Sequence, residues 1–243
     1  MNILSIGNSF SEDAQRYLHQ IAKCDGFTLN AFNLYIGGCS LSRHYRNMIN
    51  EQRAYTLEMN GESTGFMVSL KEALINRDWD IVTIQQVSHQ SPYYETYQPY
   101  LDKLCEYVRF CVPKAKIAMH QTWAYKQGSN RLNVELGYEI HTDMFEDVKN
   151  AYEKAAKAVK ADLVIPSGEL FQKLIESGIE KVHRDTFHAS LGLGRYALGL
   201  LWYHALAGNP ISNNNFSDFD EEVSKDEIEI AKNCVNNLYS TKK

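Results

Sequence analysis

Short apolar segments alternate along the chain with longer segments whose apolar residues recur at helical spacing. This alternation is typical of a parallel β-sheet covered by α-helices. Apolar positions from Ala14 to Ile21 predict a first helix, which Gly26 ends. Further helices are expected at 97–112, 144–159 and 191–206. The short apolar segments predict five strands, at residues 3–6, 29–36, 81–85, 117–119 and 163–165.

Two segments fall outside this alternation. Residues 55–66 are aromatic and polar and contain two glycines, which indicates a hairpin excursion. Near the end of the chain, Ser224 and Glu227 form a capping-box pattern, so we expect a C-terminal helix at about 224–239 packed on the domain. The sequence shows no internal repeat, low-complexity tract or flexible linker. We therefore expect one domain over residues 1–243.

Composition excludes several classes of function. The chain has 243 residues, of which 44% are hydrophobic, and its net charge of -5 argues against nucleic acid as a partner. The five cysteines are odd in number and show no CxxC spacing, so we interpret them as reduced thiols or buried apolar side chains. No apolar stretch approaches the roughly 18 residues that suggest a membrane span. The oligomeric state is not predicted by any of these features.

The N-terminus bears on localisation. Met1 runs directly into the first predicted strand, with no signal peptide before it. As written, the sequence predicts a cytoplasmic protein. A periplasmic or secreted protein whose signal peptide had been removed would show the same sequence.

Ser9 lies three residues after the first predicted strand, where the first helix is expected to begin. In an open parallel sheet, ligands bind beyond the carboxyl ends of the strands. The start of a helix also offers unpaired backbone N–H groups that suit an oxyanion. Ser9 is therefore a candidate nucleophile. The alternative is structural, because residues 9–12 (Ser-Phe-Ser-Glu) also match a capping box.

Asp185 and His188, in a loop before a glycine-rich helix, could activate such a serine. A serine hydroxyl is a poor nucleophile at neutral pH, so an imidazole must take its proton and a carboxylate must orient the imidazole. The three-residue step lets the carboxylate fold back onto one imidazole nitrogen and leaves the other for the nucleophile. The alternative is a pair of ordinary loop residues that cap the following helix.

Polar and aromatic residues follow the other predicted strands. Gly38 follows the second strand, where a glycine lets backbone N–H groups approach a ligand or simply makes a tight turn. The third strand leads into residues 85–91 (Gln-Gln-Val-Ser-His-Gln-Ser), and because buried amides are costly unless bonded, we expect this cluster to face a cleft. Tyr93 and Trp123 follow the third and fourth strands. They could form a platform for a sugar ring or only the rim of the core.

Four short blocks of the sequence together resemble the SGNH (GDSL-type) hydrolase superfamily, and specifically its bacterial DUF4886 branch. They are residues 6–11 (Ile-Gly-Asn-Ser-Phe-Ser), Gly38, residues 85–89 and residues 185–188 (Asp-Thr-Phe-His). The blocks occur in the order of the superfamily and span almost the whole chain. The resemblance implies a flavodoxin-like, three-layer α/β/α fold with a parallel five-stranded sheet.

The resemblance also implies a catalytic triad, with Ser9 as nucleophile, His188 as base and Asp185 as the residue that orients the base. It implies an oxyanion hole formed by the backbone N–H groups of Ser9 and Gly38 and by one side-chain amide. No cofactor is implied.

The sequence departs from the superfamily pattern in two blocks. Asn8 stands where Asp is usual, and the usual Gly-x-Asn-Asp of the third block is absent. We assign the third oxyanion donor to Gln86, with Gln85 and His89 as alternatives, since only a neutral N–H donor aimed at the developing charge is required.

These residues predict a serine esterase that removes small acyl groups, acetyl in particular, from a carbohydrate or related metabolite. We expect His89, Tyr93 and Trp123 to contact this substrate. One alternative is a catalytically weak or inactive carbohydrate-binding protein on the same fold, which the altered third block favours. Another is a metal hydrolase that uses His183, Asp185 and His188, with or without His120, but no recognised ligand spacing is present, so no metal is expected.

Overall fold

The computed structural model describes residues 1–240, and these form a seven-stranded sheet in the order β4-β3-β2-β1-β5-β6-β7. The central strands β1 and β5 are buried on both faces, which explains their continuous apolar sequences. Five strands that are adjacent in this order, β2, β1, β5, β6 and β7, run parallel to one another. All five predicted strands are present, as β1 (Asn2–Gly7), β2 (Asn30–Tyr35), β5 (Ile81–Ile84), β6 (Lys116–His120) and β7 (Leu163–Ile165).

The prediction of a five-stranded sheet is wrong, because the expected hairpin joins the sheet. Strand β3 (Tyr55–Met59) pairs antiparallel with β2, and β4 (Glu62–Val68) pairs antiparallel with β3. Asn60 and Gly61 connect β3 to β4 and both have positive φ, as a two-residue hairpin turn of type I′ requires. The sheet is therefore mostly parallel, with an antiparallel edge.

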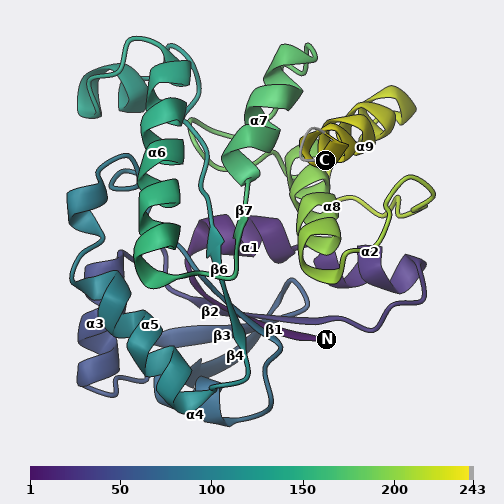
Figure 1. Cartoon of the computed structure of the whole chain (residues 1–243). Helices are drawn as coiled ribbons and strands as arrows, with labels where there is room; N and C mark the ends of the chain where they lie inside the picture. The colour runs from purple at the N-terminus through teal and green to yellow at the C-terminus, as the bar shows by residue number, and fades with distance from the viewer. Residues whose placement is uncertain (241–243) are drawn as a thin grey trace.

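Helices cover both faces of the sheet, which gives the three layers seen in Figure 1. Those of one layer are α1 (Ser9–Gln15), α2 (Leu18–Cys24) and α8 (Leu193–Ala207), and those of the other are α3 (Leu41–Ile49), α4 (Leu70–Ile75) and α5 (Tyr100–Cys111). Helix α6 (His141–Val159) packs beside α5 and α7 (Ser167–Glu176), and α9 (Lys225–Ser240) packs on α7 and α8. Two short turns complete the list, the 3-10 turn η1 (Tyr94–Thr96) and the π-helical turn η2 (Arg131–Glu135).

Helix α8 is buried almost all round, and its glycines allow close packing. A Cβ added at Gly199 would lie 2.7 Å from Cδ1 of Ile21 on α2. The glycine therefore lets α8 pack closely against a neighbouring helix. None of the helices within residues 1–240 combines the length and apolar character that a membrane crossing needs.

The order of the strands places a crevice beside β1. The chain passes from β1 to β2 on one side and returns to β5 on the other, so β1 lies at the topological switch point. Loops that follow the carboxyl ends of β1, β2 and β5 diverge there, and such points are where open α/β sheets bind ligands. Ser9 begins α1 directly after the first of these loops, and Gly38 and residues 85–89 lie in the other two.

Candidate active site

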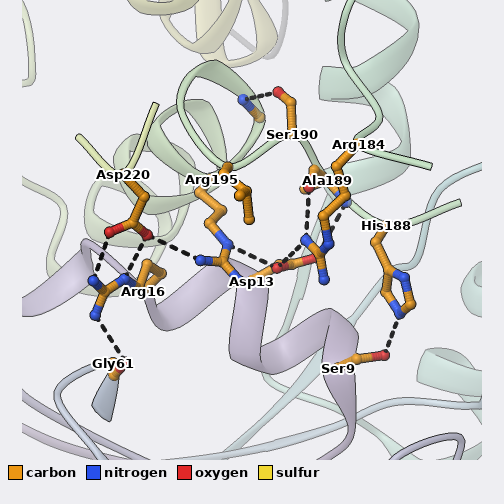
Figure 2. Close-up of polar contacts among 12 residues, drawn as sticks. Ser9, Asp13, Arg16, Gly61, Arg184, His188, Ala189, Ser190, Arg195 and Asp220 are labelled. Atoms are coloured by element: carbon orange, nitrogen blue, oxygen red, sulfur yellow. Dashed lines mark hydrogen bonds and ion pairs between the residues drawn. The ribbon is translucent and has the colours of Figure 1, made fainter. Parts of the chain in front are cut away.

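Ser9, His188 and Asp185 form a hydrogen-bonded chain beyond the carboxyl end of β1. Oγ of Ser9 lies 2.9 Å from Nε2 of His188 (Figure 2), and Nδ1 of His188 lies 2.7 Å from Oδ2 of Asp185. Because an ionised carboxylate only accepts, Nδ1 carries the proton and Nε2 is free to accept the proton of Ser9. A nucleophile, its base and an orienting carboxylate have this arrangement in the triad of serine hydrolases, so the three residues are a candidate triad.

The structure overturns the alternative that Ser9 caps helix α1. Asn8 is the N-cap residue, and its side chain accepts the backbone N–H of Phe10 at 3.0 Å. Ser11 completes the capping box, since its hydroxyl accepts the backbone N–H of Asn8. The hydroxyl of Ser9 takes no part in the cap and forms a hydrogen bond with His188.

The loop conformation keeps the Asp185 carboxylate ionised. Its Oδ1 accepts the backbone N–H groups of Phe187 and His188, each at 2.8 Å. Burial by itself would raise the pKa of Asp185, but the hydrogen bonds from Phe187 and from the His188 ring and backbone outweigh it and lower the pKa to about 2. At neutral pH the carboxylate is therefore charged and fixed in place.

Asp13 anchors the His188 loop to the helix that carries Ser9 (Figure 2). It lies four residues after Ser9 on α1 and is fully buried. Its Oδ1 accepts from Nη1 of Arg184 at 2.7 Å and from Nε of Arg195 at 2.8 Å, and its Oδ2 accepts the backbone N–H of Ala189 at 3.1 Å. Arg184 also donates to the carbonyl of Ala189. Both flanks of the triad loop are thus fixed to α1, a role that the sequence analysis did not assign to Asp13.

A pocket of about 390 Å³ opens beside the triad. Within residues 1–240, neither the Ser9 nor the Gly38 backbone N–H has a hydrogen-bond partner. Gly38 has φ +61, which a glycine adopts without strain. Two residues with unpaired backbone N–H groups therefore line the pocket, and one of them is the candidate nucleophile. The lining consists of Asn8, Ser9, Phe10, Tyr35, Gly37, Gly38, Val87, Ser88, His89, Arg131, Phe187 and His188.

Gln86, the predicted third oxyanion donor, does not line this pocket and is fully buried. Its Nε2 donates to the carbonyl and the hydroxyl of Thr96, each at 3.1 Å. Its Oε1 accepts the backbone N–H groups of Leu41 and Val87. The side chain therefore joins the loops that follow β2 and β5 from within. Of Gln86 and its two predicted alternatives, Gln85 and His89, it is His89 that lines the pocket.

Gln85 is also buried, so the expectation that residues 85–91 face a cleft holds for residues 87–89, which line the pocket, but not for the two amides. Its Nε2 donates to Oδ1 of Asn8 at 2.7 Å, and its Oε1 accepts from Nδ1 of His120 at 2.7 Å. Asn8 in turn donates to the carbonyl of Cys39, which follows Gly38. Burial lowers the pKa of His120 to about 3, so this ring is neutral. The amide groups of Gln85 and Asn8 thus find their hydrogen-bond partners within the protein. These bonds connect the carboxyl ends of β6, β5, β1 and β2.

One of the three residues predicted to contact the substrate lines the pocket, and the other two do not. His89 lines the pocket. Trp123 is fully buried, stacks on Phe10 with ring centroids 4.2 Å apart, and donates from Nε1 to the carbonyl of Phe187 at 2.7 Å. Tyr93 lies outside the pocket lining, with its hydroxyl 3.5 Å from the carbonyl of Leu136. Trp123 thus contacts Phe10 and Phe187, which line the pocket, from the side of the core.

The alternative of a metal site involved His183 and His120. Within residues 1–240, no group of three His, Cys, Asp or Glu side chains is placed to hold a metal ion. Nε2 of His183 lies 3.1 Å from the carbonyl of Ala124, and the His120 ring bonds Gln85. Both rings act as structural hydrogen-bonding groups.

Comparison with known proteins gives one family match. The model of DUF4886, a domain of unknown function, matches residues 2–238. A crystal structure of a DUF4886 family protein from Bacteroides uniformis is 32% identical, with a TM-score of 0.92 over 99% of this chain and 95% of that chain. No protein of curated function matches the sequence.

Two more distant structures share the fold. A putative SGNH hydrolase from Slackia heliotrinireducens is 26% identical, with a TM-score of 0.62 over 84% of this chain and 97% of that chain. Est24, a carbohydrate acetylesterase from Sinorhizobium meliloti, is 15% identical, with a TM-score of 0.52 over 85% and 96% of the two chains, a likeness that shows the fold alone. Since the family model covers almost the whole sequence, the chain belongs to the DUF4886 family, within the SGNH hydrolase superfamily.

Proposed function

We propose that this protein is a serine esterase that removes small acyl groups, acetyl in particular, from a carbohydrate or related metabolite. The observation that carries the proposal is the chain from Ser9 through His188 to Asp185, with distances of 2.9 Å and 2.7 Å. Two further features support it. The pocket beside the chain holds unpaired N–H donors, and the carboxylate is ionised at neutral pH.

The proposed reaction proceeds through an acyl-enzyme. Oγ of Ser9 attacks the ester carbonyl while Nε2 of His188 takes its proton, and Asp185 orients and stabilises the resulting imidazolium. When the tetrahedral intermediate collapses, the alcohol leaves with the proton from His188. Water then attacks the acyl group, again losing its proton to His188, and regenerates Ser9.

The developing oxyanion needs donors aimed at it. We assign two of them to the backbone N–H groups of Ser9 and Gly38, and we propose that the third comes from residues 88–89 in place of Gln86. Ser88 and His89 line the pocket, whereas both N–H groups of the Gln86 amide bond Thr96. Each such donor typically contributes about 10²–10³ in rate.

The substrate class rests on the size of the pocket and on one structural relative. A volume of about 390 Å³ lies near the lower end of the roughly 300–1,000 Å³ of ligand pockets. This favours short acyl groups. Est24, which shares the fold, is a carbohydrate acetylesterase, and we propose a substrate of the same kind here.

Hydrolysis of p-nitrophenyl acetate, butyrate and octanoate, and acetate release from acetylated xylose, test the proposal. We expect the acetate ester to turn over fastest and Ser9→Ala to lose this activity while unfolding at the wild-type temperature. Ser177→Ala removes an exposed serine at the end of α7 and serves as the matched control. Equal rates for wild type and Ser9→Ala would reject the esterase hypothesis and favour the alternative of a carbohydrate-binding protein.

A further inference from the structure

Arg131 places a cation in the candidate active-site pocket. It begins the π-helical turn η2 and lines the pocket together with Ser9 and His188. Its guanidinium carbon lies 4.3 Å from the centroid of the Phe187 ring, and that ring lies 4.0 Å from the ring of His188. One aromatic ring therefore separates the cation from the candidate base.

Among the described residues, no carboxylate forms an ion pair with Arg131, and no Asp or Glu lines the pocket. Glu135, on the same turn, is exposed and does not pair with Arg131. Its charge only opposes the lowering of the His89 pKa. Arg131 thus brings an unpaired positive charge to the pocket lining of a protein whose net charge is -5.

Three titratable side chains in or beside the pocket, His89, Tyr35 and Tyr125, are neutral at pH 7. Partial burial lowers the pKa of His89, and Arg131 lowers it further. Burial raises the pKa of the Tyr35 phenol. Burial also raises the pKa of Tyr125, against the smaller effects of Ser88 and Arg131. Arg131 therefore sets the charge of this wall of the pocket.

The placement of the guanidinium suits an oxyanion. When its face stacks on an aromatic ring, the N–H groups along its edge remain available as a planar fork that fits a carboxylate or sulfate in two parallel hydrogen bonds. An unpaired charge inside a concave, low-dielectric site also concentrates ions of opposite sign. Single π-helical turns occur frequently at functional sites.

We propose that Arg131 binds an anionic oxygen group of the substrate, so that this enzyme deacylates acidic sugars or related acids in preference to neutral ones. The inference rests on the proposed esterase function and narrows its substrate class. The shared chemistry is a planar or tetrahedral oxyanion, carried as a carboxylate or as a sulfate.

Three aryl acetates that differ in one substituent test this inference. 4-Acetoxybenzoate and 4-acetoxybenzenesulfonate carry the two anions, and 4-acetoxybenzamide is the uncharged analogue. We expect Arg131→Gln to lower the ratio of kcat/KM for either anion over the amide by about tenfold or more, and Arg131→Lys to restore part of it. Comparing variants on the same ester cancels the intrinsic reactivity of the leaving group. Thermal unfolding checks that each variant is folded.

Lys126→Gln is the matched control, because it removes an exposed cation outside the pocket lining from the preceding loop. We expect its ratio to stay at the wild-type value, and the wild-type ratio to fall as salt screens the charge. A larger effect on the benzoate assigns a carboxylate, and a larger effect on the sulfonate assigns a sulfate. A ratio that is the same in wild type and Arg131→Gln overturns the inference.

Binding of the product acid separates this inference from the esterase proposal. If wild type hydrolyses none of the esters, the proposed function is wrong. Titration calorimetry with 4-hydroxybenzoate and 4-hydroxybenzamide then decides about Arg131. Binding of the acid that Arg131→Gln abolishes supports the anion site, and equal or absent binding in the two proteins overturns it.

Discussion

The buried carboxylate of Asp13 accepts the backbone N–H of Ala189 at 3.1 Å, and so joins the helix of the candidate nucleophile to the loop of the candidate base. The two residues are 176 positions apart in the sequence. Arg184 and Arg195 bracket the same carboxylate. The distance between Ser9 and His188 therefore depends on a charged group that takes no part in the proposed chemistry.

We predict that Asp13→Asn lowers both stability and kcat. Removing one partner of a buried ion pair costs about 3–5 kcal/mol, and displacement of a catalytic group by about 1 Å can cost 10²-fold in rate. Urea unfolding gives the change in the free energy of unfolding, and ester hydrolysis at a temperature where the variant is folded gives kcat.

Asp220→Asn is the control for Asp13, since Asp220 pairs with Arg16 and Arg195 at the surface but does not contact the His188 loop. We expect this variant to lose some stability with a much smaller change in kcat. Equal losses of kcat in the two variants would show that Asp13 has no particular role in placing His188.

We predict that Gln86→Leu is mainly a stability variant. The change leaves the backbone N–H groups of Leu41 and Val87 without their acceptor, and each unpaired buried donor costs about 1–3 kcal/mol. An oxyanion donor would instead cost about 10²–10³ in rate. A variant with normal urea stability and a rate reduced at least a hundredfold would reinstate Gln86 in the oxyanion hole.

Glu58 gives the protein a pH-dependent stability. Its side chain is buried in the sheet and accepts from Nδ2 of Asn33 at 2.8 Å. Burial raises its pKa from 4.5 to about 7, which outweighs the opposing hydrogen bond from Asn33. Because the folded state holds this proton more tightly than the unfolded state, the stabilising contribution is complete below pH 4.5 and is lost as the pH rises through about 7.

We predict that Glu58→Gln removes this dependence. The variant should be more stable than wild type at pH 8, by on the order of 2–3 kcal/mol, and the difference should shrink as the pH falls toward 5. Urea unfolding of both proteins across this range measures it. A difference that is independent of pH would mean that Glu58 does not titrate in this window.

The sequence pattern predicted the parallel strands because they are buried on both faces and are therefore continuously apolar. It missed β4 as a sheet member because an edge strand with one partner needs few apolar residues, and most of β4 is exposed. The two glycines of residues 55–66 indicated a hairpin, but the pairing of that hairpin with β2 is a tertiary contact that no local pattern encodes.

The site residues divide in the same way. The contacts among Ser9, Asp185 and His188 were predictable, because a candidate nucleophile, base and orienting carboxylate can be recognised by residue type and position in the sequence. Asp13 and Arg131 were not, since their roles depend on partners distant in the sequence. Trp123 follows a strand as a ligand platform would, but stacking with Phe10 and Phe171 buries it.

Intact mass spectrometry after treatment with a fluorophosphonate probe tests the activation of Ser9 most directly. We predict one adduct on wild type, mapped to Ser9, none on Ser9→Ala, and slow labelling of His188→Gln, because the probe reacts with a serine whose proton a base removes. A folded wild-type protein that takes up no probe, or that is labelled as fast as Ser9→Ala, would contradict the account.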